Sequence, residues 1–146
     1  TAEMGVMIWR LTVAGAALGD MVVGMAKNGG VAALVTDGPA RDLAGIVPHG
    51  LPVFATGLNP NSPYGKGPGK VGYPVHIGGR RVASGDIVVG DRDGVVVVPF
   101  DEIDRIISAL KAVQAAETAL EAKVQGGLST LEVFGDLLRS SRTCRE

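Results

Sequence analysis

Short apolar segments alternate with a helix-forming segment in the first third of the chain, and this alternation constrains the fold more than any other feature. Residues 31–35 and residues 51–55 are short apolar runs bounded by turn-forming residues. Between them, residues 41–47 predict a short helix that Pro48 and Gly50 bring to an end. Strands that alternate with helices are typical of βαβ units, in which the strands are parallel. The pattern therefore predicts an α/β fold.

The rest of the chain predicts further strands, turns and helices without internal repeats or an interdomain linker. We therefore expect one domain over residues 1–146, with residues 128–146 as a C-terminal helix and tail. The other expected elements are a strand within residues 4–13, a helix over residues 21–26, a loop over residues 57–70, hairpins over residues 71–83 and 87–98, a long helix over residues 101–125, and a last helix that begins with the capping box Ser129–Glu132.

Charge and hydropathy exclude some classes of partner and favour a compartment. The net charge is −1 without a strongly basic block, which argues against a nucleic-acid partner. No apolar run reaches the ~18 residues of a membrane span, so we expect no membrane partner. Cys144 is the single cysteine, so the chain forms no internal disulfide. That usage favours a reducing compartment, and we expect a cytoplasmic protein.

The long helix carries an acid where its pattern calls for an apolar residue. At ~100° per residue, Glu117 falls at the centre of an apolar stripe and Glu121 lies toward its edge. A carboxylate on such a face is costly unless it is paired, protonated or bound to a metal. Glu117 either pairs with an arginine of a neighbouring element, or supplies an acid to an active site across a subunit boundary. The apolar members are Ile103, Ile106, Ile107, Leu110, Val113, Leu120 and Val124.

Two further carboxylates stand at predicted helix starts. Asp20 follows Gly19, and Asp42 follows Arg41 after a strand and turn. Backbone N–H groups are unpaired at such positions, and the crevice beyond the strand ends of α/β folds collects ligands. Oxygen-only ligands favour Mg²⁺ or Mn²⁺ over Zn²⁺. The alternative is that both acids only stabilise helix starts and that Arg41 is a surface cation, because spacing alone does not bring them together.

Several motifs, taken in order, resemble the RraA-like family, in particular its class II pyruvate aldolase branch. That branch contains the 4-hydroxy-4-methyl-2-oxoglutarate/4-carboxy-4-hydroxy-2-oxoadipate aldolases. The resemblance covers roughly residues 14–127 and implies a swivelling β/β/α domain of the RraA-like type, assembled as trimers or hexamers. The motifs are Gly19-Asp20, Val31–Asp42, Leu51–Ala55, Gly67-Pro68-Gly69, Gly78-Gly79, Ser84-Gly85-Asp86 and Gly90–Pro99.

The resemblance also implies roles for individual residues. Asp42 would ligate a divalent metal, Mg²⁺ or Mn²⁺, and Asp20 would hold the metal through a water molecule. Arg41 would contact the keto oxygen of the substrate. Glu117, or Glu121 in second place, would complete the site from an adjacent subunit. The substrate carboxylate would be held by the backbone amides of Gly19, Asp20, Met21 and Val22.

The implied activity is metal-dependent cleavage of a 4-hydroxy-2-oxo acid to pyruvate and a second oxo acid, with oxaloacetate decarboxylation as a side activity. One alternative is a regulator of the kind that inhibits ribonuclease E, which shares the fold but lacks the metal-binding Asp. The presence of Asp42 favours the enzyme. A second alternative is a degenerate, inactive member, because Leu11–Leu18 replaces the expected glycine-rich segment and the usual N-terminal region is apparently lacking.

Other chemically suggestive residues have simpler interpretations. Lys27 is expected to be a cation at a helix C-terminus rather than a Schiff-base lysine. The segment Gly65–Lys70 lacks the Ser or Thr of a phosphate-binding loop and is expected to be a flexible loop, although Lys66 or Lys70 could meet a second substrate carboxylate. His49 and His76 have no partner ligands nearby in sequence and are expected to be structural.

Overall fold

The computed structural model describes residues 5–10, 15–62, 69–131 and 134–135. The chain forms two compact units, Thr1–Ile103 and Asp104–Glu146. The first unit holds the sheet, two helices and two hairpins, and the second holds most of one long helix.

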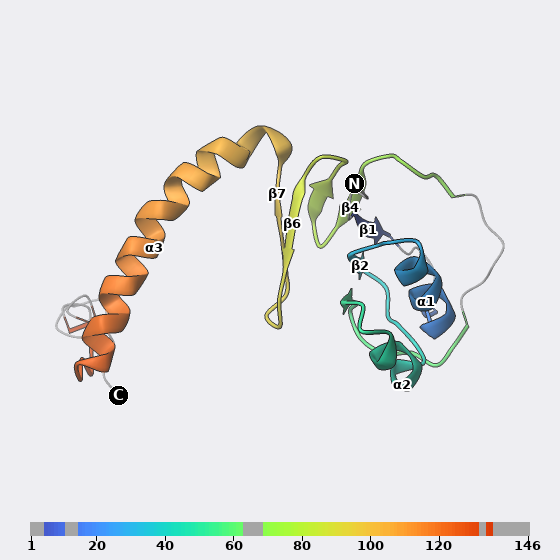
Figure 1. Ribbon diagram of the computed structural model, residues 1–146, viewed down its shortest axis with the longest axis horizontal. Helices are drawn as coiled ribbons and strands as arrows, with labels where there is room; N and C mark the ends of the chain where they lie inside the picture. The colour runs from blue at the N-terminus through green and yellow to red at the C-terminus, as the bar shows by residue number, and fades with distance from the viewer. Residues whose placement is uncertain (1–4, 11–14, 63–68, 132–133, 136–146) are drawn as a thin grey trace, which may run out of the picture. The chain divides into compact units, whose positions relative to one another are not determined.

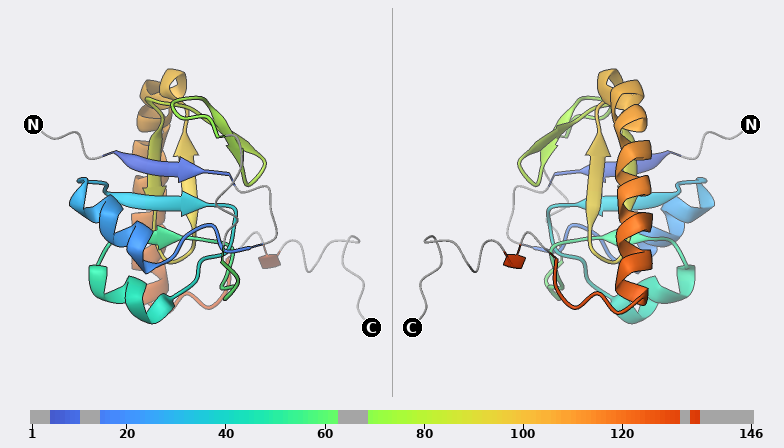
Figure 2. Two further views of the ribbon diagram at one scale, coloured as in Figure 1. Left: turned by 90° about the vertical axis from the view of Figure 1, so that its right-hand side faces the viewer. Right: turned by 90° about the vertical axis from the view of Figure 1, so that its left-hand side faces the viewer.

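A three-stranded parallel sheet organises the first unit. Its strands are β1 (Val6–Trp9), β2 (Ala33–Thr36) and β3 (Val53–Phe54), in the order β1-β2-β3. Figure 2 shows the three strands running side by side in the same direction. Because parallel strands end at a common edge, the loops after β1, β2 and β3 all leave the sheet on one side.

The connections between these strands carry the helices α1 (Asp20–Asn28) and α2 (Leu43–Ile46), and α2 continues into a 3-10 helix, Val47–His49. Both helices lie on the same face of the sheet (Figure 1). An aliphatic core fills the space between helices and sheet. Its buried members are Leu18, Val23, Ala26, Leu34, Ala40 and Ile46.

Two antiparallel hairpins lie on the other face of the sheet (Figure 1). The first pairs β4 (Val75–Ile77) with β5 (Arg80–Val82), and the second pairs β6 (Ile87–Gly90) with β7 (Val95–Val98). The second hairpin packs closely on β3, since a Cβ on Gly90 would lie 2.5 Å from the Phe54 ring. Helices, sheet and hairpins thus form successive layers.

The long helix α3 (Ile103–Gln125) follows a 3-10 turn, Phe100–Glu102, and is followed by a turn at Gly126. The structure describes every residue of α3, and none of them is buried. Among the described residues, no helix is both long and apolar enough to cross a membrane. The last helix predicted from Ser129 falls largely outside the described residues, which include helical residues 134–135.

The predicted elements that fall within the described residues are present, but several boundaries differ. The strands expected at 31–35 and 51–55 begin at Ala33 and Val53, because Val31 and Leu51 pack against the core from the preceding turns. The helix expected over 41–47 begins at Leu43, since Asp42 adopts a left-handed backbone with φ 59° and ψ 43°. That conformation cannot continue a right-handed helix, so α2 cannot include Arg41.

Candidate functional site at the carboxyl edge of the parallel sheet

Three loops meet beyond the carboxyl ends of the parallel strands and are joined by backbone pairing. Ala40, in the loop after β2, bridges in parallel to Leu18 on one side and to Leu58 on the other. The Arg41 amide donates to the Leu18 carbonyl at 2.9 Å. This pairing places Gly19 and Asp20 directly beside Arg41 and Asp42. Asp20 and Asp42 are separated by 22 positions in the sequence.

The side chains of Arg41 and Asp42 both lie over Gly19. A Cβ on Gly19 would come 2.6 Å from Asp42 Oδ2 and 3.0 Å from Arg41 Nε. Real Cβ atoms do not approach so closely, so any larger residue at position 19 would require the Asp42 and Arg41 side chains to shift. The Arg41 Nε and Asp42 Oδ2 atoms are 3.1 Å apart, which makes them an ion pair. That nitrogen is shielded from solvent, and no acceptor among the described residues is aligned to receive its hydrogen.

Asp20 makes the reciprocal contact with the start of α2. A Cβ on Gly45 would come 2.5 Å from Asp20 Oδ2 and 2.7 Å from Asp20 Cβ. Each carboxylate therefore rests against a glycine of the other segment: Asp42 on Gly19 and Asp20 on Gly45. Both carboxylates lie at helix N-termini, where the helix dipole favours negative charge.

The third loop contributes Ser62. The Arg41 Nη1 group donates a hydrogen bond to the Ser62 hydroxyl oxygen. The Arg41 side chain is 33% exposed and the Asp42 side chain 45% exposed, so both remain accessible to a small ligand. Arg41 is therefore in contact with both Asp42 and Ser62, and its role in substrate binding stays a prediction.

The N-terminus of α1 carries the four residues predicted to bind a carboxylate. Gly19 is the N-cap residue, and its backbone is extended and offers no side-chain cap. The Met21 amide donates to Asp20 Oδ1 at 2.7 Å, and Met21 and Val22 are exposed. The Met21 amide is thus already engaged by Asp20, and a ligand carboxylate would compete with that side chain for it.

The residues Asp20, Arg41, Asp42 and Ser62 are called the charged corner below. The oxygen ligands that this corner offers are of the kind that Mg²⁺ binds. Asp20 and Asp42 supply carboxylate oxygens, and the described residues contain no group of three or more His, Cys, Asp or Glu side chains suited to a metal. Mg²⁺ is commonly bound through one or two carboxylates, with waters and substrate oxygens filling the other positions. A structural zinc site needs four protein ligands of another kind. Asp20 and Asp42 are the residues that would hold a divalent cation here.

Glu117 and Glu121 lie on α3, in the second compact unit, and both are exposed. The predicted apolar stripe is present on α3, and Ile107, Leu110 and Val113 are about half exposed. No residue of α3 is buried, and the two roles expected for Glu117 stay predictions.

Lys27 and His49 have structural contacts away from the two carboxylates. Lys27 lies in the last turn of α1, and its Nζ donates to the His49 carbonyl oxygen. The His49 ring lies against Gly24, where a Cβ would come 2.9 Å from the ring. Both residues fasten α1 to the 3-10 helix after α2, in agreement with the structural roles expected for them. Lys70 lies over the Tyr73 ring, 5.6 Å from its centroid.

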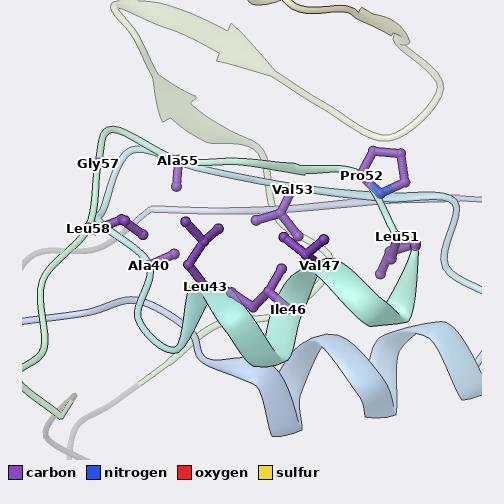
Figure 3. A pocket seen from close by; sticks show the side chains of 11 residues that line it. Ala40, Leu43, Ile46, Val47, Leu51, Pro52, Val53, Ala55, Gly57 and Leu58 are labelled. Carbon is purple, nitrogen blue, oxygen red and sulfur yellow. The ribbon is translucent and has the colours of Figure 1, made fainter.

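An apolar groove of about 590 Å³ runs along α2 and β3 in the first unit (Figure 3). Leu43, Val47 and Leu58 are at least half exposed along it. None of Asp20, Arg41, Asp42 or Ser62 belongs to its lining, so this groove is separate from the charged corner. Its lining is Ala40, Leu43, Ile46, Val47, Gly50, Leu51, Pro52, Val53, Ala55, Gly57 and Leu58.

Two residues of the corner escaped the sequence analysis. Gly45 had a usable signal, because a glycine inside a short predicted helix is unfavourable and often marks a close approach of another group. Ser62 had none, since it lies 21 residues from Arg41 in a loop without periodicity.

Comparison with known proteins agrees with the fold and with the order of the motifs. Residues 3–97 match the RraA-like family, described as Aldolase/RraA. A protein of Halalkalibacterium halodurans, named "Putative 4-hydroxy-4-methyl-2-oxoglutarate aldolase", is 32% identical over 116 residues, which are 80% of this chain and 55% of that protein. The chain spans about half the length of this relative and of two further curated relatives.

Solved structures give the same result. An uncharacterized protein from Pseudomonas syringae pv. tomato aligns with a TM-score of 0.77 at 28% identity, covering 87% of this chain and 61% of that one. Streptomyces coelicolor RraAS2, described as an unusual member of the RNase ES inhibitor RraA protein family, aligns with a TM-score of 0.70 at 33% identity, covering 80% and 62%. The expected RraA-like α/β fold with a long C-terminal helix is confirmed, and the chain belongs to the RraA-like family.

Proposed function

We propose that this protein is a divalent-metal-dependent lyase that cleaves a 4-hydroxy-2-oxo acid, mono- or dicarboxylic, to pyruvate and a second oxo acid. The observation that carries the proposal is the reciprocal packing of Asp20 on Gly45 and Asp42 on Gly19. It gathers two carboxylates and the Arg41 guanidinium at the carboxyl edge of the sheet. The aldolase name of the Halalkalibacterium halodurans relative supports the same chemistry.

The substrate is a planar 2-oxo acid with a carboxylate beside a keto oxygen. In the proposal, the Arg41 guanidinium binds the keto oxygen, and the N-terminus of α1 from Gly19 to Val22 binds the carboxylate. Asp42, with Asp20 acting through a water molecule, would hold Mg²⁺ or Mn²⁺. A bound cation would draw electron density from the keto oxygen and neutralise charge that develops on it.

Cleavage begins when a base removes the proton of the 4-hydroxyl group. The C3–C4 bond then breaks, and C4 becomes the carbonyl carbon of the second oxo acid. The electron pair of the broken bond stays with C3 and forms the enolate of pyruvate. Arg41 stabilises the enolate oxygen, because a fixed guanidinium donates charge-assisted hydrogen bonds where negative charge appears. Protonation at C3 gives pyruvate. Asp20 acting through a water molecule, or Glu117 of an adjacent subunit, serves as the base.

Loss of CO₂ from oxaloacetate produces the same pyruvate enolate. The residues that stabilise the enolate in the aldol reaction therefore also favour decarboxylation, and we propose this as a side activity. Decarboxylation needs no group that removes a hydroxyl proton. A variant that loses only the base should therefore keep decarboxylation, whereas a variant that loses Arg41 should lose both reactions.

We further propose a homotrimer or hexamer with the site at a subunit interface, in the cytoplasm. The apolar groove along α2 and the apolar stripe of α3 support assembly, because apolar patches of this kind mark interaction sites. Glu117 lies on that stripe and would reach the site from the neighbouring subunit. Glu121 is the second candidate for this acid.

A non-catalytic regulator is the alternative function, favoured by the likeness to the RraAS2 structure. Such a regulator would bind a ribonuclease and would not need paired carboxylates. The position of Asp42 over Gly19 favours the enzyme. An inactive family member is the remaining alternative.

The proposal is tested by pyruvate release from 4-hydroxy-4-methyl-2-oxoglutarate and from oxaloacetate, with Mg²⁺, with Mn²⁺ and with excess EDTA. We expect release with either cation and none with EDTA. A folded oligomer that releases no pyruvate from either substrate would rule out these reactions. Inhibition of a ribonuclease E-type enzyme by that inactive protein would establish the regulator instead.

A further inference from the structure

We propose that Ser62 is a positioning residue that orients the Arg41 guanidinium toward the enolate oxygen, a role that rests on the proposed lyase function. Arg41 Nη1 donates to the Ser62 hydroxyl, and Arg41 Nε lies 3.1 Å from Asp42 Oδ2. Nη1 is thereby held by a hydrogen bond, and Nε lies in the ion pair with Asp42. The two N–H groups of Nη2 are the donors that the proposal assigns to the ligand.

The loop that carries Ser62 is built onto the other two loops of the site. The Ala40 amide donates to the Gly57 carbonyl, and the Asn59 amide donates to the Ala40 carbonyl, both at 2.9 Å. The Asn61 carbonyl accepts from the Ala16 amide at 3.1 Å. These bonds fix the backbone immediately before Ser62 to the loops that precede α1 and α2.

A side-chain bond holds the same loop from within. The Asn59 Oδ1 atom accepts from the Asn61 amide at 2.9 Å, which closes a tight turn. Ser62 therefore directly follows a turn whose position is set by both neighbouring loops. Such a support lets a short hydroxyl side chain define the direction of a long and otherwise flexible arginine.

Arg41 contacts the substrate, and Ser62 orients the Arg41 guanidinium. Loss of the hydroxyl leaves the charge of Arg41 in place, so ground-state binding of a 2-oxo acid changes little. The bond-breaking step needs the N–H groups aimed at the enolate oxygen, so it slows. Threonine keeps a hydroxyl at the same place and preserves the function.

The test compares Ser62→Ala and Ser62→Thr with Ser84→Ala, an exposed serine in the turn before β6 that serves as the matched control. We expect Ser62→Ala to lower kcat for pyruvate release by about tenfold to a hundredfold, with KM changed by less than about threefold. Ser62→Thr and Ser84→Ala should stay within about twofold of the wild type. A Ser62→Ala variant with wild-type kcat would overturn the inference.

A second readout does not depend on catalysis. Phenylglyoxal modifies accessible guanidinium groups, and peptide mass spectrometry measures its reaction at Arg41 against the exposed Arg80 in the same sample. We expect Ser62→Ala to raise Arg41 modification relative to Arg80 by about threefold or more, because Nη1 is released. An unchanged ratio contradicts the orienting role even if the wild type proves inactive, so failure of the lyase proposal and failure of this inference remain distinguishable.

Discussion

The carboxylate of Asp42 rests on the backbone of Gly19, so that a Cβ on Gly19 would come 2.6 Å from Oδ2. This contact joins the loop after β1 to the loop after β2 and brings Gly19-Asp20 and Arg41-Asp42 together at one place. Gly19 has an extended backbone, with φ −135° and ψ −174°. Any residue can adopt that conformation, so the effect of a larger residue here comes from space alone.

We therefore predict that Gly19→Ala weakens the site through sterics. The added methyl group pushes Asp42 and Arg41 away from the corner, and kcat/KM for pyruvate release falls by about tenfold or more. Mg²⁺ affinity, measured by calorimetry, falls in parallel. Gly5→Ala is the control, because a Cβ on Gly5 meets no atom within 4 Å. Equal activity of Gly19→Ala and Gly5→Ala would contradict the packing described here.

Gly45→Ala tests the reciprocal contact and sets two effects against each other. In a helix interior, alanine is favoured over glycine by about 0.5–1 kcal/mol. Here the new Cβ would lie 2.5 Å from Asp20 Oδ2 and 2.7 Å from Asp20 Cβ. Because overpacking typically costs about 1–3 kcal/mol, we expect lower stability in urea unfolding and loss of activity. A more stable variant would show that Asp20 moves freely.

Much of the fold follows from local sequence, and the deviations have physical causes. The start of α1 after Gly19 and both hairpin turns were predicted, because glycine and acidic residues mark those positions. Strand starts were misplaced because Val31 and Leu51 are apolar for packing rather than for pairing. α2 starts later than predicted because Asp42 has a left-handed backbone. The sequence around Asp42 did not predict that conformation.

The site was predictable as separate residues but not as an arrangement. Asp20, Arg41 and Asp42 were identified from helix starts and from family resemblance. Their convergence depends on the Leu18–Ala40–Leu58 pairing, which joins loops and leaves no periodic signal. The engagement of the Met21 amide by Asp20 also depends on side-chain direction, which the sequence alone does not specify.

Substitution of Lys27 distinguishes Schiff-base catalysis from metal-dependent catalysis. Its Nζ donates to the His49 carbonyl oxygen at the end of α1, and it is exposed. We expect Lys27→Met to retain lyase activity within about twofold and to lose no more than about 1 kcal/mol of stability. Borohydride added with pyruvate should leave the wild-type mass unchanged. A trapped pyruvate adduct on Lys27 would mean Schiff-base catalysis and contradict the metal-dependent scheme.

Glu117 tests whether neighbouring subunits share one site. We expect Glu117→Gln to lose aldol cleavage, whereas Glu121→Gln retains it and provides the matched control on the same helix. Mixing unfolded Glu117→Gln and Asp42→Asn chains and refolding them together should restore activity, because about a quarter of interfaces then carry both native residues. The absence of recovery in a mixed oligomer, shown by mass spectrometry, argues for sites within single chains.

Substitution at Asp42 tests the central claim most directly. Asparagine tolerates the left-handed backbone of Asp42, whereas alanine adds a strain of about 1–2 kcal/mol, so Asp42→Asn removes the charge without disturbing α2. The measurement is pyruvate release from 4-hydroxy-4-methyl-2-oxoglutarate at saturating Mg²⁺ by the wild type and Asp42→Asn, with equal Tm values as the criterion of matched folding. We predict Mg²⁺-dependent release by the wild type and a loss of at least about a hundredfold in Asp42→Asn. Release by Asp42→Asn at the wild-type rate, or wild-type release that persists in EDTA, would contradict a metal-dependent lyase site at Asp42.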